Sequence, residues 1–386
     1  MTVVDIRSIF SQRNIELFDV SSSYIYYAEE KNEDGHNDLF ILEYNRSTRR
    51  ERLVTNYTLE DPTFVEHLYS FENTIILVLE NGSNSMWIIE IDKTTGTEKN
   101  RRKVVCTGAF RNCFALDSTH LLIYMGPDEA NSAMFARYSE VTGCECLCYL
   151  YNLKNNTKHF IKNPLIAKLG GAGLRKLSIH GDEYIVLLDP FGDEAIKKRY
   201  YDEQRWINAD IRDNLWLCGL IRLEAELEAG VEQISKKCIA SADIKALVHY
   251  MGIDGDKVFF RAKEFRTGIE KICSYDVVAN SLAVEAELTA PEGTETMYIV
   301  EEKPFAVFEV KNEGEKTRVH GVVGRKADIS YDSSLGSFIS CIDERYIVAR
   351  HDDEQGSSVV LYDSTLDKSE TYKGSCYLSG NTLVLY

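Results

Sequence analysis

A recurring pattern of short apolar runs constrains this chain more than any other feature, and residues Phe338–Lys373 show it most clearly. The runs there are Ile339–Ile342, Tyr346–Ala349 and Val359–Tyr362, followed by a mostly polar segment that ends at Lys373. Clusters of Asp, Gly and Ser separate them, which is typical of short strands joined by turns. The stretch therefore predicts a four-stranded antiparallel meander.

Variants of this meander recur from one end of the chain to the other. The first hairpin of the unit occurs eight times, beginning at Leu17, Leu68, Phe114, Leu177, Met251, Met297, Ile339 and Cys376. A second hairpin follows each of the first seven copies. In several of these hairpins the first strand ends in Tyr or Ile followed by Asp or Asn, and a turn comes next. The mean step is about 51 residues, close to the period of β-propeller blades, each of which is a four-stranded sheet.

The last unit contains only one hairpin, at 376–386. We expect its partner strands to come from Thr2–Arg13 and to close the ring non-covalently, because an open ring exposes strand edges. The hairpin count predicts eight blades, and seven stays open as an alternative because Met297–Val310 is the least regular copy. The predicted fold is all-β: a single β-propeller domain of residues 1–386 with a small helical insertion.

One hairpin carries a resemblance to known proteins. Trp87–Asn100, with the sequence WIIEIDKTTGTEKN, resembles the second hairpin of quinoprotein-like bacterial β-propellers, in which a strand ends in Asp and a Thr-Gly turn follows. The resemblance implies the propeller fold. It transfers no catalytic residues, because the Trp-Asp dipeptide of WD repeats and the Asp box of sialidases are both absent from the sequence.

Two stretches interrupt the repeat. Phe191–Leu215 lies between the two hairpins of the fourth unit and is rich in helix formers, with Ile196, Tyr200 and Ile207 at roughly helical spacing. Ile161–Lys176 precedes the same unit and predicts a short helix that ends at a glycine of Gly170–Gly173. Both stretches map to connections on one face of a propeller, where repeat proteins often carry their binding surface.

The segment Leu223–Gly230 has helix-forming composition, but its apolar residues alternate. Ile221, Leu223, Ala225 and Leu227 follow a period of two after the apolar run Leu215–Leu220. We therefore expect a strand here.

The composition excludes some classes of partner. The chain has 44 basic and 61 acidic residues, a net charge of −17, and no basic stripe with interleaved aromatic residues, so binding of nucleic acid is not expected. The sequence contains no apolar run long enough to span a membrane and no visible secretory signal. Most of the ten Cys lie inside apolar runs as buried thiols, so we expect a cytoplasmic, reduced protein. The net negative charge also predicts a monomer.

Cys144, Cys146 and Cys148 are a candidate metal site. At alternate positions on a strand the three thiols would share one face, and thiolates suit zinc or copper(I). The usual second pair of zinc ligands is missing, so packing in the core of a blade is favoured and no cofactor is expected.

Glycine-rich and acidic motifs have a structural explanation. Gly170–Gly173 could approach an anion but lacks the Lys-Ser/Thr of a phosphate-binding loop, and a flexible turn is favoured. His180–Glu183 and Asp254–Asp256 place carboxylates beside glycine where the first hairpins must turn. Hairpin turns are favoured there over calcium binding or acid–base catalysis.

The predicted insertion is also the candidate binding surface. It places a basic and aromatic group on an acidic protein, the composition of interaction hot spots: Arg199, Tyr200, Tyr201, Arg205 and Trp206. An equally good explanation is that Tyr200 and Trp206 hold the helix against the ring.

These features predict a non-catalytic binding or scaffolding module that presents one loop face to a protein or peptide. The alternative is an enzyme, or a site for a sugar or a peptide, at the mouth of the central channel. The two functions predict different side chains. An enzyme should have carboxylates and histidines at the channel mouth, whereas a scaffold should have an exposed apolar patch.

Overall fold

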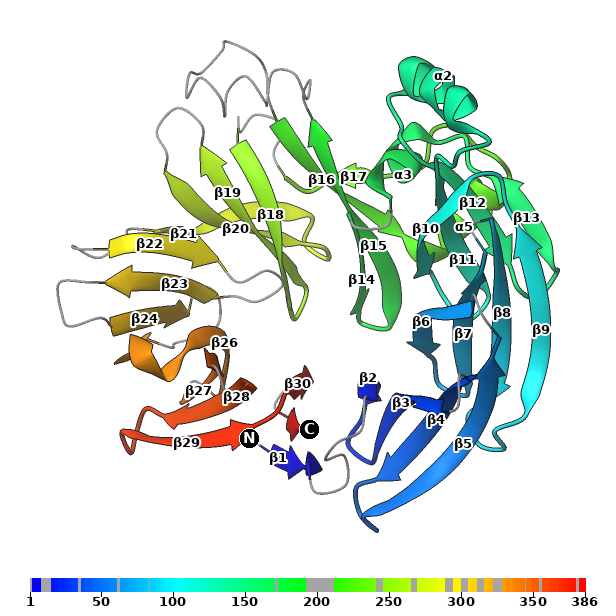
Figure 1. The fold of residues 1–386 in the computed structure, drawn as a ribbon. Helices are drawn as coiled ribbons and strands as arrows, with labels where there is room; N and C mark the ends of the chain where they lie inside the picture. The colour runs from blue at the N-terminus through cyan, green and yellow to red at the C-terminus, as the bar shows by residue number, and fades with distance from the viewer. Residues whose placement is uncertain are drawn as a thin grey trace. The chain divides into compact units, whose positions relative to one another are not determined.

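The computed structural model describes residues 2–7, 15–33, 36–60, 63–82, 84–170, 173–191, 212–240, 246–264, 269–288, 294–299, 305–310, 316–321, 328–343, 345–353, 356–379 and 382–386. Within these residues the protein is mostly β, with few helices, and the strands form seven four-stranded sheets and one three-stranded sheet (Figure 1). The chain divides into two compact units. One contains Phe10–Lys176 and Gly219–Ser235, and the other contains Met1–Ile9, Leu177–Cys218 and Lys236–Tyr386.

The first of these units contains three sheets whose strands follow one another in chain order. They are β2 (Ile15–Val20), β3 (Tyr24–Glu33), β4 (His36–Asn45) and β5 (Arg50–Leu59); β6 (Thr63–Ser70), β7 (Thr74–Asn81), β8 (Ser85–Asp92) and β9 (Glu98–Val105); and β10 (Ala109–Ala115), β11 (His120–Gly126), β12 (Leu147–Asn152) and β13 (Thr157–Phe160). All neighbours are antiparallel, as the meander pattern predicted.

The other unit contains four more meanders of the same kind. They are β14 (Leu174–Ile179), β15 (Asp182–Phe191), β16 (Arg212–Gly219) and β17 (Lys237–Cys238); β18 (Ala246–Asp254), β19 (Lys257–Glu264), β20 (Glu270–Asp276) and β21 (Ser281–Leu288); β22 (Thr294–Ile299), β23 (Phe305–Val310), β24 (Lys316–Gly321) and β25 (Asp328–Asp332); and β26 (Ser337–Ile342), β27 (Tyr346–Asp353), β28 (Gly356–Asp363) and β29 (Lys368–Lys373). A short 3₁₀ helix, η1 (Ser333–Leu335), joins the last two sheets.

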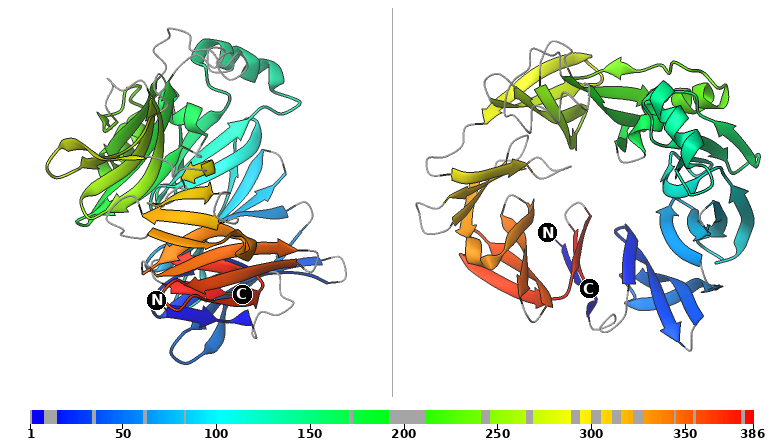
Figure 2. Two further views of the ribbon diagram at one scale, coloured as in Figure 1. Left: turned by 90° about the vertical axis from the view of Figure 1, so that its left-hand side faces the viewer. Right: turned by 45° about the horizontal axis from the view of Figure 1, so that its top comes forward.

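The three-stranded sheet joins the two ends of the chain. β30 (Cys376–Ser379) and β31 (Thr382–Leu385) form a hairpin, and β1 (Thr2–Asp5) lies parallel to β31 in the register Thr2 to Thr382. The backbone N–H of Ile6 extends the pairing by donating to Leu385 O at 3.0 Å. Figure 2 shows this strand from the N-terminus beside the C-terminal hairpin in two further views.

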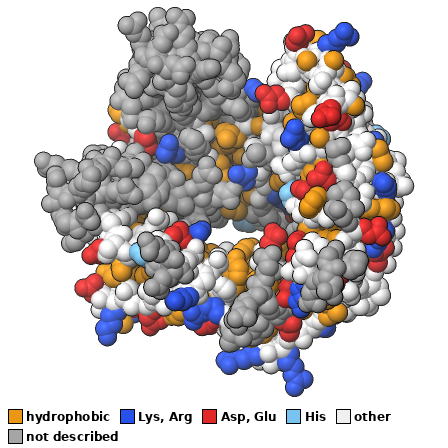
Figure 3. All heavy atoms as spheres, in the orientation of Figure 1, with side chains coloured by type: hydrophobic (Ala, Val, Ile, Leu, Met, Phe, Trp, Pro, Cys, Tyr) orange, Lys and Arg blue, Asp and Glu red, His pale blue; other side chains and the backbone are white. Residues whose placement is uncertain are grey.

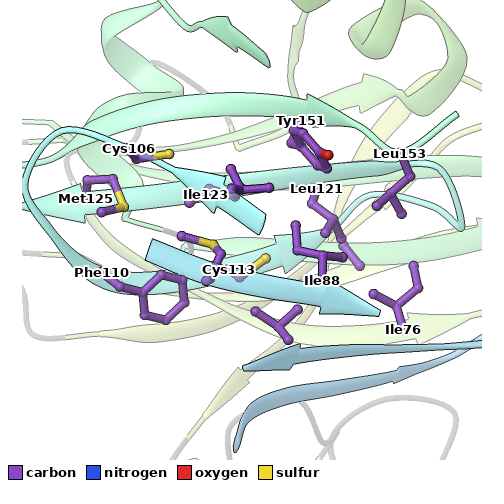
Figure 4. Packing of buried hydrophobic residues seen from close by; sticks show 14 of the residues in the cluster. Ile76, Ile88, Cys106, Phe110, Cys113, Leu121, Ile123, Met125, Tyr151 and Leu153 are labelled. Carbon is purple, nitrogen blue, oxygen red and sulfur yellow. The ribbon is translucent and has the colours of Figure 1, made fainter. Parts of the chain in front are cut away.

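β7 explains why the apolar runs in the sequence are continuous. Five of its residues in a row, from Ile75 to Leu79, are buried. Ile75 and Leu77 pack into a cluster with β3 and β4, whereas Ile76 and Val78 pack into a cluster with β10–β12 (Figure 4). The strand is therefore covered on both faces, and burial of each such side chain contributes roughly 1.5–3 kcal/mol.

The Asp or Asn that ends the third strand of several sheets starts the turn that follows. Oδ1 of Asp92 accepts from the backbone N–H groups of Thr94 and Thr95, each at 2.9 Å. Gly96, four residues after Asp92, has φ +71°. Equivalent turns begin at Asn45, Asn152, Asp276 and Asp363 and place Arg49, Asn156, Asn280 and Asp367 at positive φ. The pattern that resembles propeller hairpins is thus a local turn motif.

α5 (Leu220–Glu228) corrects a prediction. The alternating segment that we expected to be a strand is a helix, in which Leu220, Leu223 and Leu227 are buried at helical spacing while Ile221 is 84% exposed. The strong helix formers of this segment outweigh a short alternation. The fourth strand of its sheet is the two-residue β17, which pairs with β16 through Trp216 and Cys238.

Two further helices lie at the connections of the β10–β13 sheet. α3 (Pro164–Leu169) confirms the predicted short helix: Asn163 caps its start and Gly170, in the left-handed conformation, ends it. α2 (Ser132–Thr142), between β11 and β12, was not predicted, and it projects beyond the strand ends in Figures 1 and 2. In the described part of the chain, every helix is too short or too polar to cross a bilayer.

Candidate functional site

The predicted binding surface cannot be placed in the structure. Arg199, Tyr200, Tyr201, Arg205 and Trp206 lie outside the described residues, as does most of the predicted insertion at 191–215. The described chain stops at Phe191, where β15 ends, and resumes at Arg212, where β16 begins. The insertion therefore connects the second and third strands of its sheet.

The three cysteines of the candidate metal site do not share a strand face. β12 begins only at Leu147, so Cys144 and Cys146 precede it, and the expectation of a common face was wrong. The thiol of Cys144 donates to Pro164 O at 3.4 Å, and Cys148 is fully buried in its strand. Burial raises the pKa of the Cys146 and Cys148 thiols, which disfavours the thiolate that a metal needs.

The remaining motifs form turns. His180 and Gly181 have positive φ between β14 and β15, and Gly255 has positive φ between β18 and β19. The hairpin-turn interpretation of both motifs is confirmed. The two turns also contact each other, because His180 Nε2 lies 2.5 Å from Asp256 Oδ1.

A cluster that the sequence motifs did not indicate surrounds His120. This residue begins β11, and Asp117 and Thr119 lie in the turn before it. Nδ1 of His120 lies 3.0 Å from Thr119 Oγ1 and 3.2 Å from Asp117 Oδ1. Oδ1 of Asp117 also accepts from the backbone N–H groups of Thr119 and His120, so the turn itself positions the carboxylate.

α5 supplies the other side of this cluster. Glu224 and Glu228, one helical turn apart, both face the imidazole. Oε1 of Glu224 lies 3.5 Å from His120 Nδ1, and Oε1 of Glu228 lies 3.1 Å from His120 Nε2. Asn152, the last residue of β12, donates to Glu228 Oε1 at 2.6 Å. Figure 1 shows α5 against the β10–β13 sheet.

The carboxylates determine the charge of the imidazole. Hydrogen bonds to Asp117 and then to Glu224 raise the pKa of His120 to about 10, against the opposing effect of burial. Burial alone would raise the pKa of Asp117, but its hydrogen bonds with His120 and Thr119 hold that pKa well below the usual range. The hydrogen bond from Asn152 and then that from His120 lower the pKa of Glu228. At neutral pH the ring is therefore a cation among carboxylates.

A second group of titratable residues lies on the first two strands of the β6–β9 sheet. A β-bulge between Val65 and His67 displaces Glu66 from regular pairing with β7. Burial, and then a hydrogen bond to Glu66, raise the pKa of Glu80. His67, next along β6, contacts Asn112 Oδ1 at 3.1 Å through Nε2, and burial lowers its pKa.

Comparisons with known proteins add only weak similarities. No protein-family model matches the chain, and no curated protein does. Among solved structures, an uncharacterized protein of Listeria monocytogenes matches with 10% identity and a TM-score of 0.42, covering 100% of this chain and 89% of that one. The β-propeller domain of the Trilobed protease from Pyrococcus furiosus matches with 12% identity and a TM-score of 0.44, covering 94% and 99%.

A prolyl endopeptidase matches with 12% identity and a TM-score of 0.49 over 93% of this chain. That match covers 48% of the endopeptidase, so the chain spans about half of its length. At this level of similarity the three proteins carry no argument about what the chain binds or does.

Proposed function

We propose that the chain is a β-propeller that acts as a non-catalytic binding module for a protein or peptide. The repeated meander supports the propeller. Seven four-stranded sheets follow one another in chain order, and an eighth sheet combines β1 with the C-terminal hairpin. Sheets that bury both faces need a neighbour on each side, and ring closure provides one for every sheet. The proposed ring has eight blades.

The positions of the long connections support a binding face. In an antiparallel meander, the connection from the second to the third strand leaves the same end of the sheet as the connection to the next sheet. α2 connects the second and third strands of the β10–β13 sheet, and α3 connects this sheet to the next one. The segment 192–211 connects the second and third strands of that next sheet. A propeller would gather all three on one face.

The observation that carries the proposal is the solvent-facing side of α2. Phe135 is buried and holds the helix, whereas Met134 is 40% exposed and Val141 is 85% exposed. These two apolar residues are seven positions apart and therefore lie on the same side of the helix, with Arg137 between them. An apolar and basic helix face suits a partner with apolar and acidic side chains, and so does the aromatic and basic composition of Arg199–Trp206.

The test compares two variants that change the proposed binding face with one control variant that changes a different part of the surface. The first variant replaces residues 195–210 by a short Gly-Ser linker, which leaves β16 intact, and the second is Met134→Glu with Val141→Glu. The control is Leu366→Glu, which changes an apolar residue, 58% exposed, in the turn between β28 and β29, at the opposite end of its sheet. We expect the first two variants to lose partners that the wild-type protein retains in cross-linking pull-downs and the control to keep them. Equal recovery with all four proteins would contradict the proposal.

The second candidate function is a catalytic or small-ligand site on the inner strands, and the Glu66–Glu80 pair favours it. A carboxyl that keeps its proton to higher pH beside a second carboxyl is suited to acid–base chemistry. In the coloured part of Figure 3, acidic and basic side chains are interspersed. A screen of glycoside and peptide substrates with wild-type protein and Glu66→Gln would detect such an activity. The cytoplasmic location and the monomeric state remain predictions from composition.

A further inference from the structure

The ligand atoms around His120 have the spacing of a metal site. One ligand atom from each of Asp117, His120 and Glu224 lies within 4.8 Å of the other two, and these residues form the one such group of three in the described part of the chain. Two ligands bound to one transition-metal ion at about 2.0–2.2 Å are themselves separated by roughly 3.0–3.5 Å. The distances from Nδ1 to Asp117 and Glu224, 3.2 and 3.5 Å, fall in this range.

Oε1 of Glu224 is buried, and its contact with His120 Nδ1 at 3.5 Å is longer than a normal hydrogen bond. A cation bound between these two atoms would give the carboxylate a shorter, direct partner. The hydroxyl of Thr119, 3.0 Å from Nδ1, is a further oxygen on the same side of the ring.

The opposite side of the ring has the arrangement usual for a metal-binding histidine. Such a histidine normally donates its other ring N–H to a carboxylate, which fixes the tautomer and the orientation of the ring. Nε2 of His120 contacts Glu228 Oε1 at 3.1 Å, and Asn152 holds that carboxylate in place. The amide of Asn152 is oriented in turn because its Oδ1 accepts from the backbone N–H of Asn155 at 3.0 Å.

We propose that Asp117, His120 and Glu224 bind one divalent transition-metal cation, with Glu228 as the residue that positions the imidazole. One nitrogen and two carboxylate oxygens suit manganese or zinc. Binding replaces the proton on Nδ1, which is released to solvent, by the cation. The site links α5 to the turn between β10 and β11. It is independent of the proposed partner-binding face.

The probe is Mn²⁺ alone, because a hard cation prefers carboxylates and imidazole over the ten thiols of this chain. Free Mn²⁺ is followed by electron paramagnetic resonance during titration of the wild-type protein at pH 7.5. We expect one site, and we expect Glu224→Gln to weaken it at least tenfold because it removes a charged ligand. The matched control is Glu226→Gln on the same helix, which should leave the affinity unchanged because Glu226 instead accepts from Ser235.

A second measurement uses only the wild-type protein. Substoichiometric Mn²⁺ should broaden the imidazole signals of His120 in ¹⁵N-histidine-labelled wild-type protein more than those of His180 and His351. Absence of binding at millimolar Mn²⁺, equal affinity in Glu224→Gln, or preferential broadening of another histidine would each overturn the proposal.

Discussion

The carbonyl oxygen of Val54 lies so close to Gly96 that a Cβ on Gly96 would be 1.9 Å from it. Val54 belongs to β5, and Gly96 lies in the turn between β8 and β9, so the contact joins two neighbouring sheets of one unit. Glycine is required there for two reasons, because the position also has φ +71°. The contact shows that the turn motif contributes to packing between sheets as well as to the local hairpin.

Gly96→Ala is therefore expected to be strongly destabilising. Positive φ costs a non-glycine residue about 1–2 kcal/mol, and displacement of the Val54 backbone adds about 1–3 kcal/mol. The control is Gly82→Ala, because Gly82 has a similar φ of +77° and nothing within 4 Å of the added Cβ. Urea unfolding should show a loss for Gly96→Ala that exceeds the loss for Gly82→Ala by at least about 1 kcal/mol. Equal losses would mean that the close contact is not maintained in solution.

Ile6 tests the pairing of the two chain ends. Its side chain is fully buried and its backbone continues the pairing of β1 with β31. Ile6→Ala should lower the free energy of unfolding by about 2–4 kcal/mol, as expected for a cavity in a packed core. Val3→Ala, on the same strand at a side chain that is 38% exposed, should cost about 0.5 kcal/mol or less. If both changes cost equally little in urea unfolding, the N-terminal strand does not pack as described.

The Glu66–Glu80 pair should make stability depend on pH. The pKa of Glu80 is raised in the folded protein, so its contribution to stability is present below the pKa of the unfolded chain and decreases as pH rises through the folded pKa. Glu80→Gln removes this titration. The variant should match the wild type near pH 4 and exceed its stability by up to about 1 kcal/mol at pH 7.5, measured by urea unfolding.

Glu72→Gln is the matched control for this pH dependence, since Glu72 is exposed in the turn of the same hairpin. Its stability should follow that of the wild type at both pH values. A stability difference between the wild type and Glu80→Gln that stays the same from pH 4 to pH 7.5 would show that the pKa of Glu80 is not raised in the folded protein.

The amino-acid sequence by itself determined the strands, their hairpin order and the turns. Alternation between apolar runs and Asp, Asn or Gly is a local property: Asp92 forms its turn with residues two and three positions later, and β7 is apolar throughout because both its faces are buried. Such short-range features can be recognised without knowledge of the fold. The same reasoning failed at α5. Four alternating apolar residues in a short segment predicted a strand, but the segment forms a helix.

Only the tertiary structure decided which titratable residues meet. His120 and Glu228 are 108 positions apart, and no spacing rule connects a hairpin turn with a helix inserted into the next sheet. The helical spacing of Glu224 and Glu228 was visible in the sequence, but the imidazole that they face was not. Long-range contacts of this kind depend on how α5 packs, and the burial of Leu220, Leu223 and Leu227 orients it so that its carboxylates reach the turn.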